Sequence, residues 1–181
     1  MTSETQYTTS DAASPQDFDV VIEIPAFSTP IKYELDERMG LLRVDRYLEG
    51  NLVFPVNYGF IADTESGDAS HLDAMVMSPF PLLAHCILRC RALGVLRMED
   101  EEGGDQKILA APAYRLCPEL ASTADLADVD SPLLDRLQHF FKTYKRVDPA
   151  RWSRVFDWED KECAEQLIGD AMITYHTRRN R

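Results

Sequence analysis

The sequence changes character after about residue 111, from short strand-like segments to helix-like segments. Before that point, segments rich in β-branched or alternating apolar residues are separated by Gly, Pro and Asp, a pattern typical of short β-strands. Strands are predicted at residues 19–24, 31–35, 41–47, 72–77, 86–98 and 107–111. Because no helical period interrupts them, an antiparallel meander or barrel is favoured over a doubly wound sheet.

Two amphipathic helices are predicted in the last third of the chain. Ser131-Pro132 supplies an N-cap and a first-turn proline, and apolar residues at helical spacing follow as far as Tyr144. A short strand is predicted at residues 153–158, and a second helical pattern runs from Cys163 to Tyr175. The sequence therefore predicts an α+β protein, mainly β, in which a small closed β-structure is flanked by two C-terminal helices.

Length and charge exclude several classes of protein. The 181 residues fit one domain, and residues 1–17, which are polar and lack an apolar core, predict a disordered tail rather than a signal peptide or membrane anchor. Residues 18–181 would then form a single domain. The net charge of −12 argues against non-specific nucleic-acid binding, which depends on a basic surface. A polyanion could still bind if a divalent metal lay between it and the protein.

The four cysteines are predicted to be reduced. Cys86 and Cys90 lie on one predicted strand, where four residues span roughly 13 Å, too far for a disulfide. Cys117 and Cys163 show no zinc-binding spacing with histidine or with another cysteine. Reduced core thiols are typical of a cytoplasmic protein.

Two pairs of aspartates suggest a metal site. Asp100 and Asp105 lie five residues apart around Gly-Gly, with Lys107 following, and a glycine turn would allow both carboxylates to reach one hard cation. Alone, such a segment is more often a solvated hairpin loop. A second pair with the same spacing, Asp68 and Asp73, favours the metal interpretation.

Other polar residues allow two interpretations each. Glu23 lies between two isoleucines and so points away from both; it faces solvent or, if its strand is rolled into a barrel, lines a polar cavity. Cationic and phenolic side chains could bind phosphate oxygens, although each alone is more often an ordinary surface residue, and Tyr144 is more simply a core aromatic. These candidates are Lys32, Arg46, Tyr58, Tyr144 and Lys145. The histidines show no close pairing and are interpreted as non-ligands.

Taken in order, these residues resemble the soluble family I inorganic pyrophosphatases of the short bacterial type. The similarity covers roughly residues 18 to 175. It is carried by the segments Val20-Val-Ile-Glu-Ile-Pro25, Pro30-Ile-Lys-Tyr-Glu34, Val44-Asp-Arg46, Phe54-Pro-Val-Asn-Tyr-Gly-Phe60, Arg89-Cys-Arg91, Gly94-Val-Leu, Asp100 through Lys107, His139-Phe-Phe, Tyr144-Lys145 and Arg151-Trp152.

The resemblance implies a fold, a reaction and a set of site residues. The fold would be an OB-like five-stranded β-barrel with two helices, and the reaction would be Mg²⁺-dependent hydrolysis of pyrophosphate to two phosphates. Asp68, Asp73 and Asp105 would hold a first metal ion, Asp73 would share a second, and Asp100 with Asp105 would take a further ion that arrives with substrate.

By the same resemblance, Glu23 would assist through water, and Lys32, Arg46, Tyr58, Tyr144 and Lys145 would bind the phosphates. Glu34 and Lys107 match active-site positions without a defined role. The family also implies a homo-oligomer, a hexamer in bacterial members, with neither nucleic acid nor membrane as a partner.

The chain departs from the family at a position that matters for catalysis. The family pattern Asp-x-Asp-Pro-x-Asp reads Asp68-Ala-Ser-His-Leu-Asp73 here, so Ser70 replaces an aspartate thought to help deprotonate or orient the attacking water. Phe54 stands where many members have tyrosine, and Thr143 replaces a histidine that contributes to subunit contacts in some bacterial members.

Two interpretations of Ser70 remain open. A neighbour, Asp63, Glu65 or His71, compensates for the lost carboxylate, or the enzyme is weakened or repurposed. The first hypothesis is therefore a pyrophosphatase with slowed turnover, and the alternative is a catalytically weak homologue that binds pyrophosphate or a related phosphate ligand in a regulatory role. A nucleic-acid-binding OB protein is disfavoured by the net charge.

Overall fold

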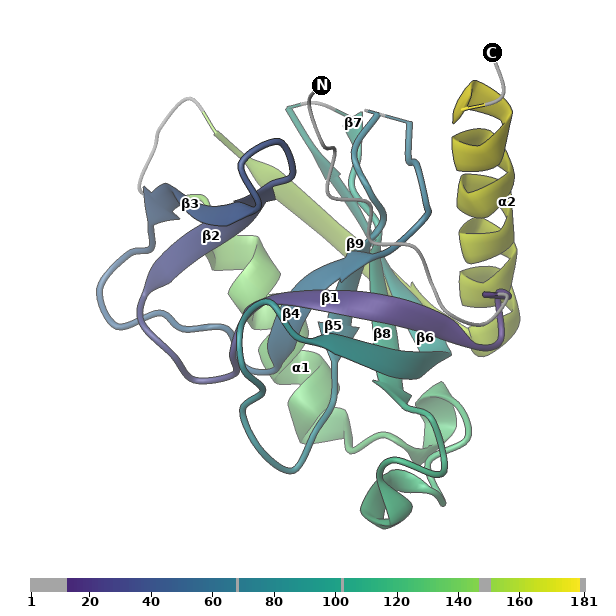
Figure 1. Ribbon diagram of the computed structural model, residues 1–181. Helices are drawn as coiled ribbons and strands as arrows, with labels where there is room; N and C mark the ends of the chain where they lie inside the picture. Colours follow the sequence, from purple (N-terminus) through teal and green to yellow (C-terminus); the bar gives the residue numbers. More distant parts are fainter. Residues whose placement is uncertain (1–12, 68, 102, 147–150, 180–181) are drawn as a thin grey trace.

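The computed structural model describes residues 13–67, 69–101, 103–146 and 151–179, and it contains one large sheet, one hairpin and two helices (Figure 1). The strands are β1 Phe18–Ile24, β2 Ile31–Asp36, β3 Leu41–Tyr47, β4 Asn57–Ile61, β5 Asp73–Val76, β6 Ile87–Asp100, β7 Gly103–Gly104, β8 Lys107–Pro112 and β9 Ser153–Glu159. The helices are α1 Ser131–Thr143 and α2 Lys161–Arg179, with 3₁₀ turns at Pro118–Leu120 and Leu126–Asp128.

Five strands close into a ring in the order β1, β4, β5, β8, β6, because β1 pairs with both β4 and β6. All of these pairs are antiparallel except β5 with β8, which is parallel. The ring confirms the predicted OB-like five-stranded arrangement flanked by two helices. The short β7 and the longer β9 extend the sheet beside β6, and β2 and β3 form a separate two-stranded hairpin.

The predicted strands and helices all occur, with ends shifted by at most a few residues, and β4 and β7 are additional. The alternative of a simple meander is wrong, since the ring order does not follow the sequence. Residues 13–17 form a turn in which Ser14 and Asp17 exchange backbone hydrogen bonds, and residues 1–12 lie outside the described part of the chain. The disordered tail and the single domain stay predictions.

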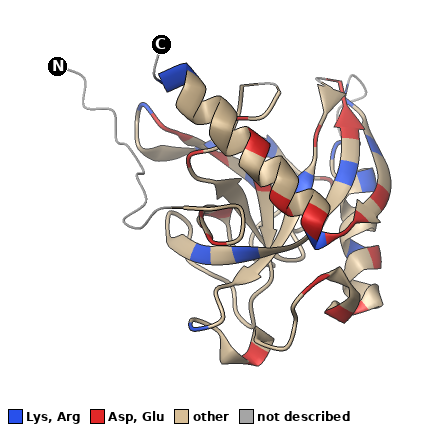
Figure 2. Ribbon diagram, turned by 90° about the vertical axis from the view of Figure 1, so that its right-hand side faces the viewer, with Lys and Arg blue, Asp and Glu red and all other residues tan. Residues whose placement is uncertain are grey.

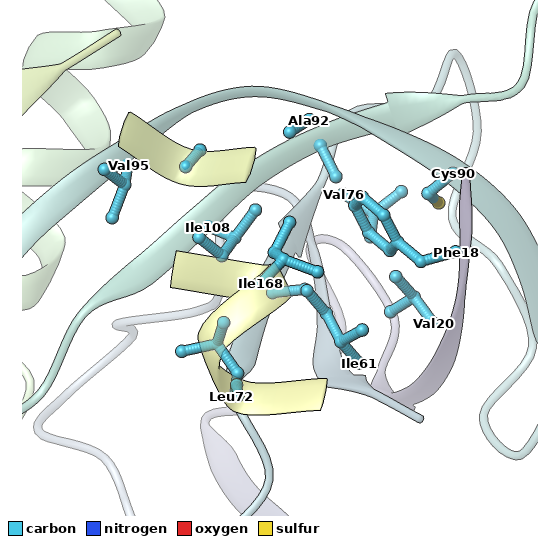
Figure 3. Close-up of a cluster of buried hydrophobic side chains, with 14 of the residues drawn as sticks. Phe18, Val20, Ile61, Leu72, Val76, Cys90, Ala92, Val95, Ile108 and Ile168 are labelled. Atoms are coloured by element: carbon cyan, nitrogen blue, oxygen red, sulfur yellow. The ribbon is translucent and has the colours of Figure 1, made fainter. Parts of the chain in front are cut away.

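The helices cover two apolar clusters on the ring. Figure 3 shows the first, in which Ile168 of α2 lies over Phe18, Val20 and Ile61. Ala164, Ile168, Ala171 and Met172 recur at helical spacing and are the buried residues of α2. In the second cluster, Leu137, Phe140 and Phe141 of α1 pack against strand residues and against Tyr144 just beyond the helix. Fully burying one such side chain stabilises the fold by about 1.5–3 kcal/mol.

The surface carries mixed charge. Figure 2 shows Lys and Arg segments interspersed with Asp and Glu segments along α2 and the neighbouring strands. Within the described residues, no helix combines the length and apolar character needed to cross a membrane.

Candidate metal and phosphate site

A polar cavity of about 710 Å³ lies between the β2–β3 hairpin and the strand ring. The predicted site residues line it, apart from Asp68, which lies outside the described residues. The acidic lining residues include Glu23, Glu34, Asp73, Asp100 and Asp105, the basic ones are Lys32, Arg46, Lys107, Lys145 and Arg151, and Tyr58 and Tyr144 also contribute. Side chains from seven separate segments thus face one space.

On the ring wall, a buried ammonium lies between two carboxylates. Asp73 begins β5 and Lys107 begins β8, and the parallel register places them side by side. Lys107 Nζ donates to the carboxylates of both Asp73 and Asp105. Burial alone would disfavour the charged amine, but Asp73 and then Asp105 raise the pKa of Lys107 well above its usual value. This position therefore attracts positive charge.

Burial also governs the other titratable groups on this wall. It raises the pKa of Asp105, which Lys107 partly opposes. Burial likewise raises the pKa of the Tyr58 and Tyr144 hydroxyls, so both phenols keep their protons and can donate hydrogen bonds to an anion.

A second ion pair lies at the far end of β6. Asp100 Oδ2 is 2.6 Å from Lys145 Nζ, and Glu101 lies 3.3 Å from the same ammonium. Lys145 follows Tyr144, the C-cap residue of α1, so the helix terminus brings a cation to the end of the strand. Both Asp100 and Lys145 are buried.

The hairpin wall carries Lys32 and Arg46, which face each other in the β2–β3 register and therefore share one side of the hairpin. Asp45, which the sequence analysis missed, lies 3.1 Å from Arg46 Nε and 3.5 Å from Lys32 Nζ. Arg46 Nη1 is buried and has no hydrogen-bond partner among the described residues. A buried donor at a cavity wall is suited to an incoming anion.

Glu23 lines the cavity, so the solvent-facing alternative is excluded. It is 6% exposed, and Oε1 accepts a hydrogen bond of 2.6 Å from the backbone N–H of Leu35. Burial raises the pKa of Glu23 to about 8, against the lowering effect of the Leu35 hydrogen bond. Strand alternation predicted that the Glu23 side chain points away from its two isoleucine neighbours. Only the closed ring shows that this direction leads into the cavity.

The three neighbours considered as replacements for the lost aspartate are engaged elsewhere. His71 contacts Glu37 and the carbonyl of Thr64 at 2.6 Å each, Glu65 pairs with Arg178, and Asp63 interacts with Tyr175. Ser70 Oγ donates to the carbonyl of His71 at 3.2 Å and lies 3.2 Å from Ser66 Oγ.

Further residues line the cavity that the sequence analysis did not assign to the site, among them Glu37, His71, Arg151 and Tyr175. Arg151 stood in a quoted family motif, whereas Tyr175 was counted only as an apolar helix position. His71 was interpreted as a non-ligand for want of a paired histidine, because spacing in sequence cannot show a partner 34 residues away.

Comparison with known proteins identifies the family. A family model described as "Inorganic pyrophosphatase" matches residues 20–176. The chain belongs to the inorganic pyrophosphatase family. A relative named inorganic pyrophosphatase from Ralstonia nicotianae is 46% identical over 161 residues, covering 89% of this chain and 92% of the relative. One from Haemophilus ducreyi is 43% identical over 159 residues, with coverage of 88% and 91%.

Solved structures of the family superpose closely. The inorganic pyrophosphatase from Coxiella burnetii matches with a TM-score of 0.88 at 40% identity, covering 92% of this chain and 99% of that one. The Thermus thermophilus enzyme matches with a TM-score of 0.89 at 32% identity, with coverage of 96% and 99%. The expected family and its bacterial type are thus confirmed.

Proposed function

We propose that this chain hydrolyses inorganic pyrophosphate to two phosphates in a reaction that depends on divalent metal, Mg²⁺. The supporting observation is one cavity in which carboxylates on the strand ring face cationic side chains on the hairpin. A phosphate site needs the cations, and a metal site needs the carboxylates; this cavity holds both.

The acidic residues fit a hard divalent cation. Their donors are carboxylate oxygens, and Lys107 Nζ already occupies a point on which Asp73 and Asp105 converge. Among the described residues, no three His, Cys, Asp or Glu side chains form a ready-made cage. Mg²⁺ keeps several waters and is usually held by one or two carboxylates together with substrate phosphates, and the carboxylates of Asp73, Asp100 and Asp105 that line the cavity can supply such ligands. We assign Asp73, Asp100 and Asp105 as ligands, with Asp68 as a fourth carried over from the family pattern.

The cationic residues fit pyrophosphate. Lys32, Arg46 and Lys145 would bind phosphate oxygens, and the protonated hydroxyls of Tyr58 and Tyr144 would donate to the same groups. These contacts would hold the leaving phosphate and take up the charge that develops on it. Bound metal would neutralise the substrate and lower the pKa of the attacking water.

Ser70 favours slow turnover. A serine hydroxyl cannot store a proton near neutral pH as a carboxylate can, and Asp63, Glu65 and His71 are held by other partners. A positioned general base contributes about 10²–10⁴-fold. We therefore expect Ser70→Asp to increase turnover and lower the pH optimum, whereas the unmodified rate continues to rise toward alkaline pH. A variant no faster at any pH would show that Ser70 does not mark a missing base.

Phosphate release from pyrophosphate with millimolar Mg²⁺ tests the proposal directly. We expect release well above background that disappears with a chelator and returns with added Mg²⁺. Tight calorimetric binding of pyrophosphate without turnover would instead favour the regulatory homologue. Folded protein that neither binds nor hydrolyses pyrophosphate would contradict both functions.

Two broader features are also proposed. A cytoplasmic location is supported by the four free cysteines, which suit a reducing compartment. A homo-oligomer, hexameric as in bacterial relatives, follows from the family alone, and Thr143 replaces one of its expected contact residues.

A further inference from the structure

His71 takes the place of the proline in the family pattern and links two parts of the cavity wall. Its Nε2 lies 2.6 Å from Glu37 Oε1, and its Nδ1 lies 2.6 Å from the carbonyl oxygen of Thr64. A carbonyl and a carboxylate only accept hydrogen bonds, so a ring nitrogen that carries a proton can donate to the acceptor beside it. The ring also stacks on Phe60, with centroids 4.7 Å apart and an interplanar angle of 11°. Its orientation is therefore set from three sides.

The Glu37–His71 contact joins elements with different proposed tasks. Glu37 lies in the turn of the β2–β3 hairpin, whose inner side carries Lys32 and Arg46. His71 lies in the acidic loop between β4 and β5, two residues before Asp73. A contact between them fixes how far the phosphate-binding cations stand from the metal-binding carboxylates.

The acidic loop is closed at its base where His71 attaches. Thr64 Oγ1 donates to the carbonyl of Ile61 at 2.6 Å and accepts from the N–H of Leu72 at 3.0 Å. The N–H of Ser66 donates to the carbonyl of Ser70 at 2.7 Å. These hydrogen bonds tie the two ends of the loop together, and the contact between Glu37 and His71 attaches the loop to the hairpin.

Proline could not make this attachment, because it offers no side-chain donor and stiffens only the local backbone. The histidine instead holds the loop from outside, through a residue 34 positions away. Hydrogen bonds to a charged partner are roughly twice as strong as neutral ones, and the buried stacking face limits competition from water.

We propose that Glu37 and His71 are positioning residues that hold the acidic loop, and with it Asp73, at a fixed distance from Lys32 and Arg46. The proposal rests on the metal-dependent function proposed above. It predicts that losing either partner weakens divalent-metal binding even before substrate is present.

The test is calorimetric titration of Mg²⁺ and Mn²⁺ into metal-free protein without pyrophosphate. We expect His71→Ala to weaken binding about tenfold, the lower end of what losing a residue that supports a metal ligand costs. Charge alone predicts no weakening, because removing an imidazole leaves the cavity no less attractive to a cation. The direction of the change therefore separates positioning from simple electrostatics.

Glu37 variants provide the second arm. Glu37→Ala should weaken binding as much as His71→Ala, and the double variant should be no weaker than either single one, because the two residues act as a pair. Glu37→Gln keeps an oxygen acceptor and should retain most of the affinity. If charge were the cause, Gln and Ala would weaken binding equally.

Arg43→Ala is the matched control, since it breaks an ion pair with Asp36 on the same hairpin outside the cavity and should change binding less than twofold. Melting curves of the metal-free proteins check that each variant folds. If His71→Ala fails to fold, the variants of the half-exposed Glu37 provide the test. Unchanged or tighter binding in both single variants, or additive losses in the double, would overturn the positioning role. Unmodified protein that neither binds Mg²⁺ nor hydrolyses pyrophosphate would overturn the proposed function instead.

Discussion

The two walls of the cavity are built by different means. The ring wall consists of strands paired on both sides, and Lys107 and Asp100 in it are almost fully buried. The hairpin wall belongs to a two-stranded sheet, where the Glu34 side chain is 54% exposed. Burial shifts pKa values on the ring wall, whereas hairpin side chains depend on a few local ion pairs. Substitutions should therefore be much more costly on the ring wall.

The largest difference in kcat should be between the alanine variants of Asp73 and Glu34. Asp73→Ala removes a proposed metal ligand and should lower kcat at least about 10³-fold, or 4 kcal/mol of barrier, whereas Glu34→Ala should cost about tenfold. Both are measured as phosphate release at saturating Mg²⁺. Asp73→Asn, which can still hydrogen-bond Lys107, controls for misfolding. Retention of most activity without Asp73 would remove the metal assignment.

Backbone packing provides a second comparison, between Gly59 on β4 and Gly50 after the hairpin. A Cβ on Gly59 would lie 1.9 Å from the carbonyl oxygen of Val21, so Gly59→Ala should lower the free energy of unfolding by about 4 kcal/mol or more. Gly50 has open space but a φ of +57°, so its alanine variant should cost about 1–2 kcal/mol. Urea unfolding measures both, and equal losses would contradict the tight approach of β1 and β4.

Glu23 and Asp36 should contribute differently to the pH dependence of the free energy of unfolding. The folded-state pKa of Glu23 is raised from 4.5 to about 8, so the folded protein binds more protons between these values and loses stability as pH rises. The loss from pH 5 to pH 8 should be about 3 kcal/mol in metal-free protein, and Glu23→Gln should abolish it.

Asp36 is the control for that experiment. The side-chain hydrogen bond from Arg43 lowers the pKa of Asp36, so its contribution is lost only as pH falls through the acidic range. Asp36→Asn should therefore leave the slope between pH 5 and pH 8 unchanged. A slope that persists in Glu23→Gln would mean that another group causes it.

The smallest change in kinetics should follow a conservative substitution on the hairpin wall. Arg46→Lys keeps the charge but loses the two-pronged guanidinium, and the KM for pyrophosphate should rise about tenfold, or 1.4 kcal/mol. Arg43, on the same strand, is not among the residues that line the cavity, so Arg43→Lys should have little effect on KM. Steady-state kinetics compare the two, and identical KM values would argue against phosphate binding by Arg46.

The sequence predicted elements better than their arrangement. The alternation of apolar residues predicted β1 and the direction of the Glu23 side chain, and Ser131-Pro132 predicted the start of α1. It missed β4, all of whose residues are buried, because a strand covered on both faces shows no alternation. The motifs contained most of the polar residues that line the cavity. Glu37 and Arg178, in contrast, contact partners that only the tertiary fold brings near.

The closure of the ring by β1 and β6 has a consequence for synthesis on the ribosome. Val20 and Val21 pair with residues of β6 near position 88, so at about 5–20 residues per second the first strand waits several seconds for its second neighbour. During that interval an apolar strand edge is open to other nascent chains. The cavity is completed later still, when Lys145, Arg151 and finally Tyr175 of α2 have been added. Nascent chains should therefore acquire the complete cavity, and with it any activity, only after Tyr175 has been synthesised.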